Sequence, residues 1–497
     1  MRRLISLAAL LSALAAAQVR KIPSSDQWFP GKPDELARML DEAFRIAGRR
    51  TGSVPPRKQL LGLIAPHAAL PYSGVVAASA YSRLDHPPNV IVLALNHSRR
   101  IEGLVAPALD AYETPLGKIR VNRDAARALG VRTEPAGKVA DHSLENQLPF
   151  VQRAAPEAGL IPLYVGELTD GELARAAGKL AARLRQGDVI VASSDLTHYG
   201  APYQYTPFPD DALIPARLRG RAAEIFDRIG SLQIAQFDRF VAETRDNLCG
   251  FLPIRLLMAA LARWNDEVYL SPVDYMASGE LTRDYRVSVG YGALAFYPAK
   301  AFGVSAADRA KLLERARSAL DRYVATASKA RVEEAAADVR DPDLSQLTPL
   351  FVTLRKNGRL RGCVGTFAPK LPLGDAVIEQ TLAAAAEDPR FAPVTASDAP
   401  LSLEISLLTP LKRLANWRDF RLGHGAVIEM DGKAGTLLPQ IAAEMGWTRE
   451  QFLENLSLKA GLAPKAYRES RAVIHVYSAQ VFAEPAELPG HAAGGRR

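Results

Sequence analysis

The chain has 497 residues, of which 48% are hydrophobic and 23% are charged, a composition typical of globular proteins. Because this length exceeds what one hydrophobic core usually serves, we expect two domains. The net charge of +8 is spread along the chain without a long lysine or arginine run, which argues against nucleic-acid binding. Two cysteines, Cys249 and Cys363, exclude a disulfide-rich scaffold but leave one bridge open.

Residues 1–17 are typical of a secretory signal. Arg2 and Arg3 precede an apolar run over 4–14, and three alanines before Gln18 form an A-x-A cleavage site. The alternative is an uncleaved membrane anchor, for which the apolar run is short. No later segment has the length and hydrophobicity of a membrane span. We therefore expect an exported protein, periplasmic or extracellular, with no stable membrane span after processing.

Residues 21–300 form the first predicted domain, in which three apolar runs lead to His67, His97 and His198. Such short Val/Ile/Leu runs are typical of strands buried on both faces of a parallel sheet. Helical patterns such as 171–185 alternate with them, which predicts an α/β domain with a mainly parallel sheet flanked by helices. Open α/β sheets bind ligands beyond the carboxyl ends of their strands. We therefore expect the three imidazoles to converge on a metal, although a single histidine at a strand end is more often structural.

Cys249 is the fourth predicted ligand. It lies just before a predicted helix that Pro253 can start, and the N-terminus of a helix favours the thiolate that binds metals. Three imidazole nitrogens and one sulfur argue against calcium and magnesium, which prefer oxygen. Iron or copper suits this set, and zinc is a further option.

His142, Glu145 and Asp195 are candidate catalytic or supporting residues. His142 and Glu145 are three residues apart on a short predicted helix that Ser143 can cap, so they would share one face. Asp195, three residues before His198, can orient an imidazole or act as an acid or base. The alternative is that Asp195 only caps the following turn.

Residues 305–485 form the second predicted domain. A helix begins after Ser305, and strands are expected at 350–354, 401–407 and 426–430. Asn-Gly and Asp-Gly turns between apolar runs indicate antiparallel hairpins. We expect a separate α+β domain here, followed by a disordered tail over 486–497.

The second domain has its own candidate site at Arg361, Cys363 and Arg390. Glycines flank Cys363 and allow a close backbone approach, and Arg361 can pair with an anion and lower the pKa of the thiol. Arg390 can reach the same neighbourhood or only pair with Asp388. The alternative for Cys363 is a small buried hydrophobic residue.

The first domain resembles the Memo family, also called AmmeMemoRadiSam system protein B. The motifs are Ala65-Pro-His-Ala68, Asn96-His-Ser98, Asp141-His-Ser-Leu-Glu-Asn-Gln-Leu-Pro-Phe150, Ser193-Ser-Asp-Leu-Thr-His-Tyr199 and Cys249-Gly-Phe-Leu-Pro-Ile254. The resemblance implies a fold similar to class III extradiol dioxygenases, which use non-haem ferrous iron, and a pocket formed by His67, His97, His198 and Cys249. Ala69-Leu70 departs from the family's Gly-Tyr, with Tyr72 close by.

The second domain resembles the AMME chromosomal-region family, AmmeMemoRadiSam system protein A. The motifs are Leu360-Arg-Gly-Cys-Val-Gly365, Glu387-Asp-Pro-Arg-Phe391, Leu438-Pro439, Gly446-Trp447 and Lys459-Ala-Gly-Leu462. The pair of resemblances implies a radical SAM protein as a system partner. The chain itself has no Cys-x3-Cys-x2-Cys motif for an iron–sulfur cluster.

Two functions are compatible with these patterns. The first is a non-haem, metal-dependent oxidoreductase, dioxygenase-like, acting on an unknown small-molecule or peptide substrate. The second is a non-catalytic metal- or peptide-binding adaptor, because a cysteine in the ligand set departs from the two histidines and carboxylate of extradiol enzymes.

Overall fold

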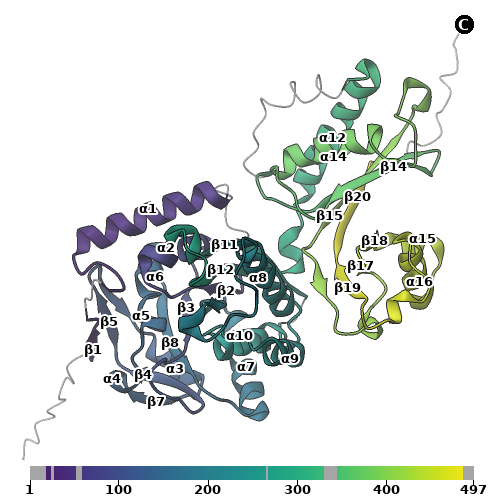
Figure 1. The fold of residues 1–497 in the computed structure, drawn as a ribbon. Coiled ribbons are helices and arrows are strands. Elements are labelled where there is room, and N and C mark those ends of the chain that lie inside the picture. Colours follow the sequence, from purple (N-terminus) through teal and green to yellow (C-terminus); the bar gives the residue numbers. More distant parts are fainter. Residues whose placement is uncertain (1–17, 24–26, 52–58, 265–266, 329–343, 485–497) are drawn as a thin grey trace, which may run out of the picture.

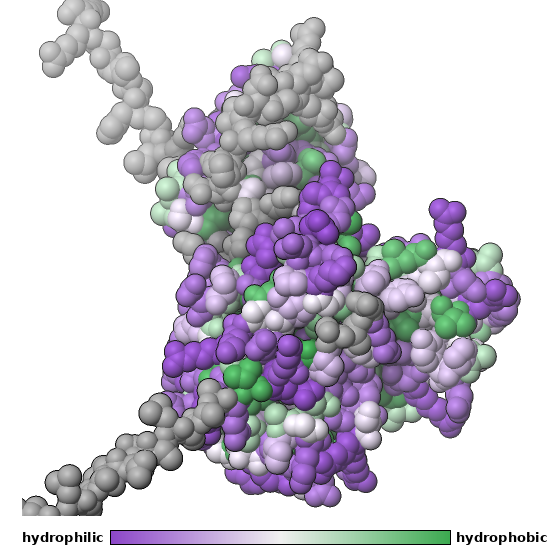
Figure 2. Space-filling model, turned by 90° about the vertical axis from the view of Figure 1, so that its left-hand side faces the viewer, coloured by the Kyte–Doolittle hydropathy of each residue, from purple (hydrophilic) through white to green (hydrophobic). Residues whose placement is uncertain are grey.

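The computed structural model describes residues 18–23, 27–51, 59–264, 267–328 and 344–484 (Figure 1). The predicted signal at 1–17 and the predicted tail at 486–497 lie outside them. No helix within the described ranges is long and apolar enough to span a membrane. Polar side chains dominate the face shown in Figure 2, and apolar side chains gather there in small groups.

A nine-stranded sheet forms the centre of the first domain, with the order β10-β12-β2-β9-β3-β8-β4-β7 and with β11 paired to β12. Its strands are β2 (Gly62–Ala65), β3 (Asn89–Ala94), β4 (Leu104–Ala108), β7 (Arg132–Pro135), β8 (Gly159–Val165), β9 (Val189–Ser193), β10 (His198–Tyr199), β11 (Val268–Ala277) and β12 (Ser288–Pro298). β2, β9, β3 and β8 run parallel to one another, as predicted. β10, β11 and β12 add antiparallel pairs on one side, and β4 is antiparallel to β8 on the other. The sheet is therefore mixed rather than mainly parallel, because the end of the domain returns as two long antiparallel strands.

Helices cover both faces of this sheet. Along β3, Val90 and Val92 pack into one apolar cluster, and Ile91 and Leu93 into the other, as expected for a strand buried on both faces. The first cluster includes α1 (Pro33–Thr51), α2 (Leu70–Tyr81) and α6 (Leu148–Ala154), and the second includes α7 (Asp170–Leu184), α8 (Ile214–Gly230), α9 (Ile234–Thr244) and α10 (Phe251–Leu261). A small sheet of β1 (Val19–Lys21), β5 (Ala111–Thr114) and β6 (Gly117–Arg120) lies beside them.

Two four-stranded sheets form the second domain, which begins with α12 (Ala306–Thr326). The first sheet contains, in spatial order, β14 (Arg359–Thr366), β13 (Leu350–Lys356), β15 (Ser402–Leu408) and β20 (Ala479–Ala483). The second contains, in spatial order, β16 (Lys412–Arg413), β19 (Val473–Tyr477), β17 (Gly425–Met430) and β18 (Lys433–Leu437). α12 and α14 (Leu373–Ala386) pack on the first sheet, and α15 (Gln440–Met445) and α16 (Arg449–Lys459) pack on the second. The predicted hairpins are present, because the Asn357-Gly358 and Asp431-Gly432 turns have the positive φ angles that such turns require.

Hydrogen bonds and ion pairs of side chains join the two domains. His424 Nε2 lies 2.7 Å from Glu267 Oε1, and His475 Nε2 lies 2.8 Å from Asp227 Oδ1. Arg413 Nη1 also donates to Asp227, over 2.9 Å. The hydrogen bond with Glu267 raises the pKa of His424, and the same bond lowers the pKa of Glu267 to about 2. We therefore expect the His424–Glu267 contact between the domains to depend on pH.

We expect the His424–Glu267 pair to be most effective in weakly acidic solution. The raised pKa of His424 stabilises the fold below the histidine's unfolded pKa of about 6.5, and this contribution is lost as the pH rises through the folded value. The lowered pKa of Glu267 contributes above its ordinary value of 4.5 and is lost as the pH falls towards 2. His424→Gln should therefore lower the unfolding temperature in calorimetry at pH 5.5 and have a much smaller effect at pH 9.

His424→Gln should lower the free energy of unfolding at pH 5.5 by no more than about 1 kcal/mol, since Glu267 is partly exposed. His86→Gln is the matched control, because the His86 side chain is 97% exposed. This variant should leave the unfolding temperature unchanged at both pH 5.5 and pH 9. An equal loss at both pH values for His424→Gln would contradict the prediction.

Candidate metal centre

His67 and His97 lie just beyond the carboxyl ends of β2 and β3, as the strand pattern predicts. Their ring centroids are 5.3 Å apart, and the rings are nearly perpendicular. The loop before α10 brings Cys249 to the same place, where its Sγ lies 3.1 Å from His67 Nε2. The ligand atoms of these three residues all lie within 4.8 Å of one another. One metal ion could therefore contact all three.

Hydrogen bonds set the tautomers of both histidines. The Ser193 hydroxyl donates to the Ser143 carbonyl, so its oxygen accepts from His67 Nδ1 over 2.8 Å. His97 Nδ1 donates to Asp141 Oδ1 over 2.9 Å. Each histidine is thereby left with an unprotonated Nε2, the nitrogen that can bind a metal. Burial lowers the pKa of His67 to about 4, so this ring is neutral at pH 7.

The Cys249 thiol is held by the chain that follows β9. Asp195 N–H donates to Sγ over 3.2 Å, and Gly250 N–H donates to Ser194 Oγ over 3.0 Å. Burial raises the pKa of the thiol well above its usual value, and the Asp195 carboxylate acts in the same direction. The predicted lowering of this pKa by the helix N-terminus is therefore wrong for the metal-free chain. A bound cation would reverse this balance, because coordination deprotonates a thiol.

His198 lies outside the group of three. Its Nδ1 donates to the Leu196 carbonyl over 2.9 Å, and its ring packs edge-on against Tyr203 at 5.1 Å. This bond leaves Nε2 unprotonated, as in the other two histidines. The structure thus brings three of the four predicted ligands together and leaves the fourth, His198, outside their group.

His142 stacks between two rings. Its centroid is 4.0 Å from that of Trp28 and 4.3 Å from that of His97, with nearly parallel planes. The ligand atoms of His97, Asp141 and His142 form a second close group. Burial lowers the pKa of His142, with the Asp141 carboxylate opposing the shift. His142 therefore forms a wall of the site and is neutral more readily than a free histidine.

Glu145 and Asp195 both bind other protein groups. Glu145 Oε1 accepts from Arg20 Nε over 2.7 Å, on the segment that carries β1. Asp195 Oδ1 accepts the backbone N–H groups of His67 and Ala68, over 2.8 and 3.3 Å. The contacts of Asp195 reach across to the loop after β2, so it positions His67 rather than merely capping its own turn.

Asp141 and Trp28 were missed by the sequence analysis. Asp141 caps α5 (His142–Glu145) by accepting from Ser143 N–H, so the expected cap by Ser143 is wrong. Burial acts to raise the pKa of Asp141, but hydrogen bonds from His97 and Ser143 outweigh it and hold the pKa well below the usual range. The position of Asp141 directly before His142 could have identified it as a candidate site residue. Trp28 lies outside every motif and gave none.

The second candidate site is only partly assembled as predicted. Arg390 Nη2 donates to the Cys363 carbonyl over 3.3 Å and also binds Asp388. Arg361 instead pairs with Asp398 over 2.9 Å. Cys249 and Cys363 are both free, so the disulfide left open by the sequence is absent from these described residues.

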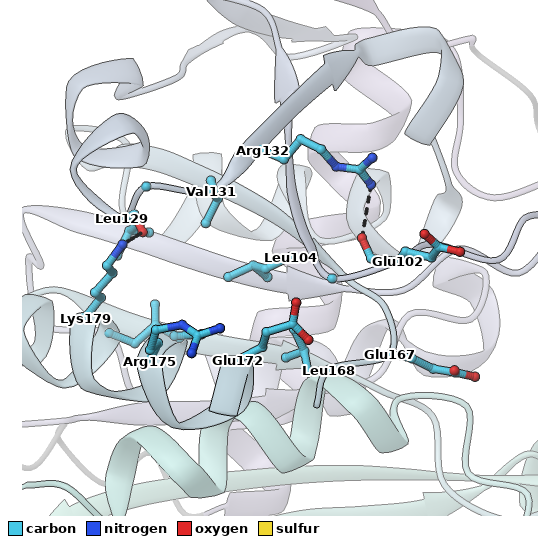
Figure 3. A pocket seen from close by; sticks show the side chains of 14 residues that line it. Glu102, Leu104, Leu129, Val131, Arg132, Glu167, Leu168, Glu172, Arg175 and Lys179 are labelled. Atoms are coloured by element: carbon cyan, nitrogen blue, oxygen red, sulfur yellow. Dashed lines mark hydrogen bonds between the residues drawn. The ribbon is translucent and has the colours of Figure 1, made fainter. Parts of the chain in front are cut away.

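A separate cavity of about 600 Å³ lies between β4, β7 and α7 (Figure 3). Its apolar lining includes Leu104 and Leu168, and charged groups of both signs surround it, among them Arg132, Arg175 and Glu172. The predicted site residues do not line it.

Comparison with known proteins assigns both halves of the chain. The profile of the Memo-like protein family matches residues 20–295, more than half of the sequence. The chain belongs to the Memo-like protein family. The AMMECR1 profile matches residues 313–482, so the two domains occur in tandem and both resemblances are confirmed.

Relatives of this chain are found in archaea. A MEMO1 family protein of Methanosarcina barkeri is 29% identical over 56% of this chain and 99% of its own length. Another, from Methanopyrus kandleri, is 30% identical over 54% of this chain and 96% of its own. Among solved structures, an uncharacterized protein of Pyrococcus horikoshii is 31% identical over 35% of this chain and 89% of its own, with a TM-score of 0.32.

Gly250 tests the packing that holds Cys249. A Cβ atom at Gly250 would lie 2.2 Å from Ser194 Cβ and 2.6 Å from the Ser193 carbonyl oxygen. Gly250→Ala should therefore lower the free energy of unfolding by about 2 kcal/mol or more in urea titrations. Gly178→Ala is the control, because Gly178 lies within α7 with open space around it, and it should raise stability by up to about 1 kcal/mol. Equal effects of the two variants would contradict this packing.

Proposed function

We propose that the Memo-like domain binds a redox-active transition metal, iron or copper, and acts as a non-haem oxidoreductase of the dioxygenase-like type. The supporting observation is the convergence of His67, His97 and Cys249 within 4.8 Å. His198 is the proposed fourth ligand.

The donor set fits such a metal. Imidazole suits iron, copper and zinc, and a thiolate favours soft or borderline ions over calcium and magnesium. In their neutral forms the two histidines of the close group present an unprotonated Nε2, so neither ring has to change its tautomer to bind a metal. A bound iron or copper ion would supply one-electron chemistry and oxygen binding.

The chain's own residues have three tasks in this proposal. Asp141 and Ser193 orient the imidazoles of His97 and His67. Trp28 and His142 form a flat aromatic wall over His97. Burial raises the pKa of the Tyr203 and Tyr291 phenols, and the Asp195 carboxylate acts in the same direction. His142 is the candidate for moving a proton, since Glu145 is held by Arg20.

A non-catalytic metal- or peptide-binding function is the second candidate. It is favoured by the engagement of both predicted carboxylates, because Asp195 holds backbone amides and Glu145 holds Arg20. Export, a radical SAM partner and a small-molecule or peptide substrate complete the proposal, on the basis of residues 1–17 and of the two-domain resemblance.

Metal analysis tests the binding site directly. The purified chain should contain about one redox metal per molecule, and His97→Ala or Cys249→Ser should lose most of it, because each removes one of three converging donors. His198→Ala measures the contribution of the outlying histidine. His86→Gln, at an exposed position, should retain the metal. Unchanged metal content in both ligand variants would refute the site.

Asp141→Asn tests the orientation of His97. Losing the charged acceptor should weaken metal binding about 10- to 100-fold in chelator competition, the usual effect of removing a ligand's supporting carboxylate.

Oxygen uptake with catechols and other phenols then separates the two functions. Turnover that falls with metal content supports the oxidoreductase, and full metal loading without turnover supports the binding protein.

A further inference from the structure

Two irregular segments are bonded to each other beside the candidate metal centre. One is 194–198, which follows β9, and the other is 246–250, which precedes and meets α10. Besides the two bonds that hold the Cys249 loop, the Thr197 hydroxyl donates to Asp246 Oδ2 over 2.8 Å. The first segment ends at one proposed ligand and the second contains another, so the protein ties these two donors together.

Asn247 makes two hydrogen bonds to His198. Its Oδ1 accepts the His198 N–H over 2.9 Å, and its Nδ2 donates to the His198 carbonyl over 2.9 Å. His198 begins β10, which is the end strand of the large sheet and has β12 as its neighbour. A strand at the end of a sheet has backbone groups without a partner in the ladder. The amide of Asn247 binds these groups as a peptide group of a further strand would.

Only an amide side chain can form this pair of bonds. A carboxamide offers a donor and an acceptor together, whereas a carboxylate only accepts and a leucine of similar size does neither. A separate bond from His198 Nδ1 to the Leu196 carbonyl sets how the imidazole is turned. Asn247 therefore fixes the backbone from which the ring projects, and it lies only two residues before Cys249.

We propose that Asn247 is a positioning residue that couples His198 to Cys249, so that imidazole and thiolate are presented to the metal as one unit. This inference rests on the proposed function, in which His198 is the fourth ligand. Asn247 contacts neither metal nor substrate and acts only through His198. Its removal should therefore weaken metal binding only in a chain that still contains His198.

A double-mutant cycle on the full-length chain tests this dependence. The probe is Zn²⁺, which binds histidine and cysteine without oxidising the thiol, and its affinity is measured by chelator competition. Asn247→Leu should weaken binding about 10-fold, the lower end of the effect of a ligand's supporting residue. His198→Ala should weaken it at least as much. In the His198→Ala chain, Asn247→Leu should change the affinity by less than about twofold, because the interaction it supports is already absent.

The two bonds can also be checked without a metal. Hydrogen exchange at the His198 amide should become about five- to tenfold faster in Asn247→Leu, since the N–H loses its acceptor. Unchanged exchange at this amide would show that the clamp does not hold His198 in solution and would overturn the inference.

Two further variants serve as controls. Asn247→Ala repeats the cycle with a smaller side chain, in case leucine strains the loop. Asn455→Leu removes an amide that donates to the Gln451 carbonyl in the AMMECR1 domain, and it should leave zinc affinity unchanged.

The outcomes separate this inference from the proposed function. The inference alone fails if His198→Ala lowers the affinity and both Asn247 variants leave it unchanged. It also fails if the Asn247 variants lower it equally with and without His198, the result of a general distortion of the Cys249 loop. An unchanged affinity in His198→Ala removes the fourth ligand and this inference with it, whereas an unchanged affinity in His97→Ala argues against the metal centre itself.

Discussion

Two buried carboxylates hold the loops of the candidate metal centre together. Asp195 ties the end of β9 to the loop after β2, through the backbone N–H groups of His67 and Ala68. Asp141 ties the loop after β3 to α5, through His97 and Ser143. A buried charge is costly unless hydrogen bonds compensate it, and here backbone donors do so. The imidazoles are therefore positioned by the protein itself, which lowers the ordering cost of binding a ligand among them.

The domains differ in how they are built and are joined by polar contacts. The Memo-like domain has one large sheet buried on both faces, whereas the AMMECR1 domain has two smaller sheets with a small apolar cluster between them. Their junction includes histidine–carboxylate contacts, His424 with Glu267 and His475 with Asp227. Polar junctions of this kind usually permit domains to move relative to each other. The charge state of His424 therefore bears on how the two halves are held.

The strands that carry His67 and His97 could be predicted because continuous apolar runs have few alternatives to a buried strand. The antiparallel pairing of β12 with β2 could not, since it joins Leu294 to Ile64 near the other end of the domain, and no local pattern reports such a partner. Cys249 and its approach to His67 followed from a helix start, but its raised pKa depends on burial that no local pattern reports. The stacking of Trp28 on His142 joins segments more than a hundred residues apart, and only the three-dimensional path of the chain reveals it.

The place of β12 has a consequence for biosynthesis. This strand lies between β10 and β2, yet it comes from the last residues of the Memo-like domain. Until it has been made, β2 remains an open edge beside His67, and the loop that brings Cys249 has only just emerged. Contacts of such long sequence separation form late, after their loop-closure entropy has been overcome. Nearly three hundred residues must therefore leave the ribosome before this sheet can be completed beside the loop that carries His67.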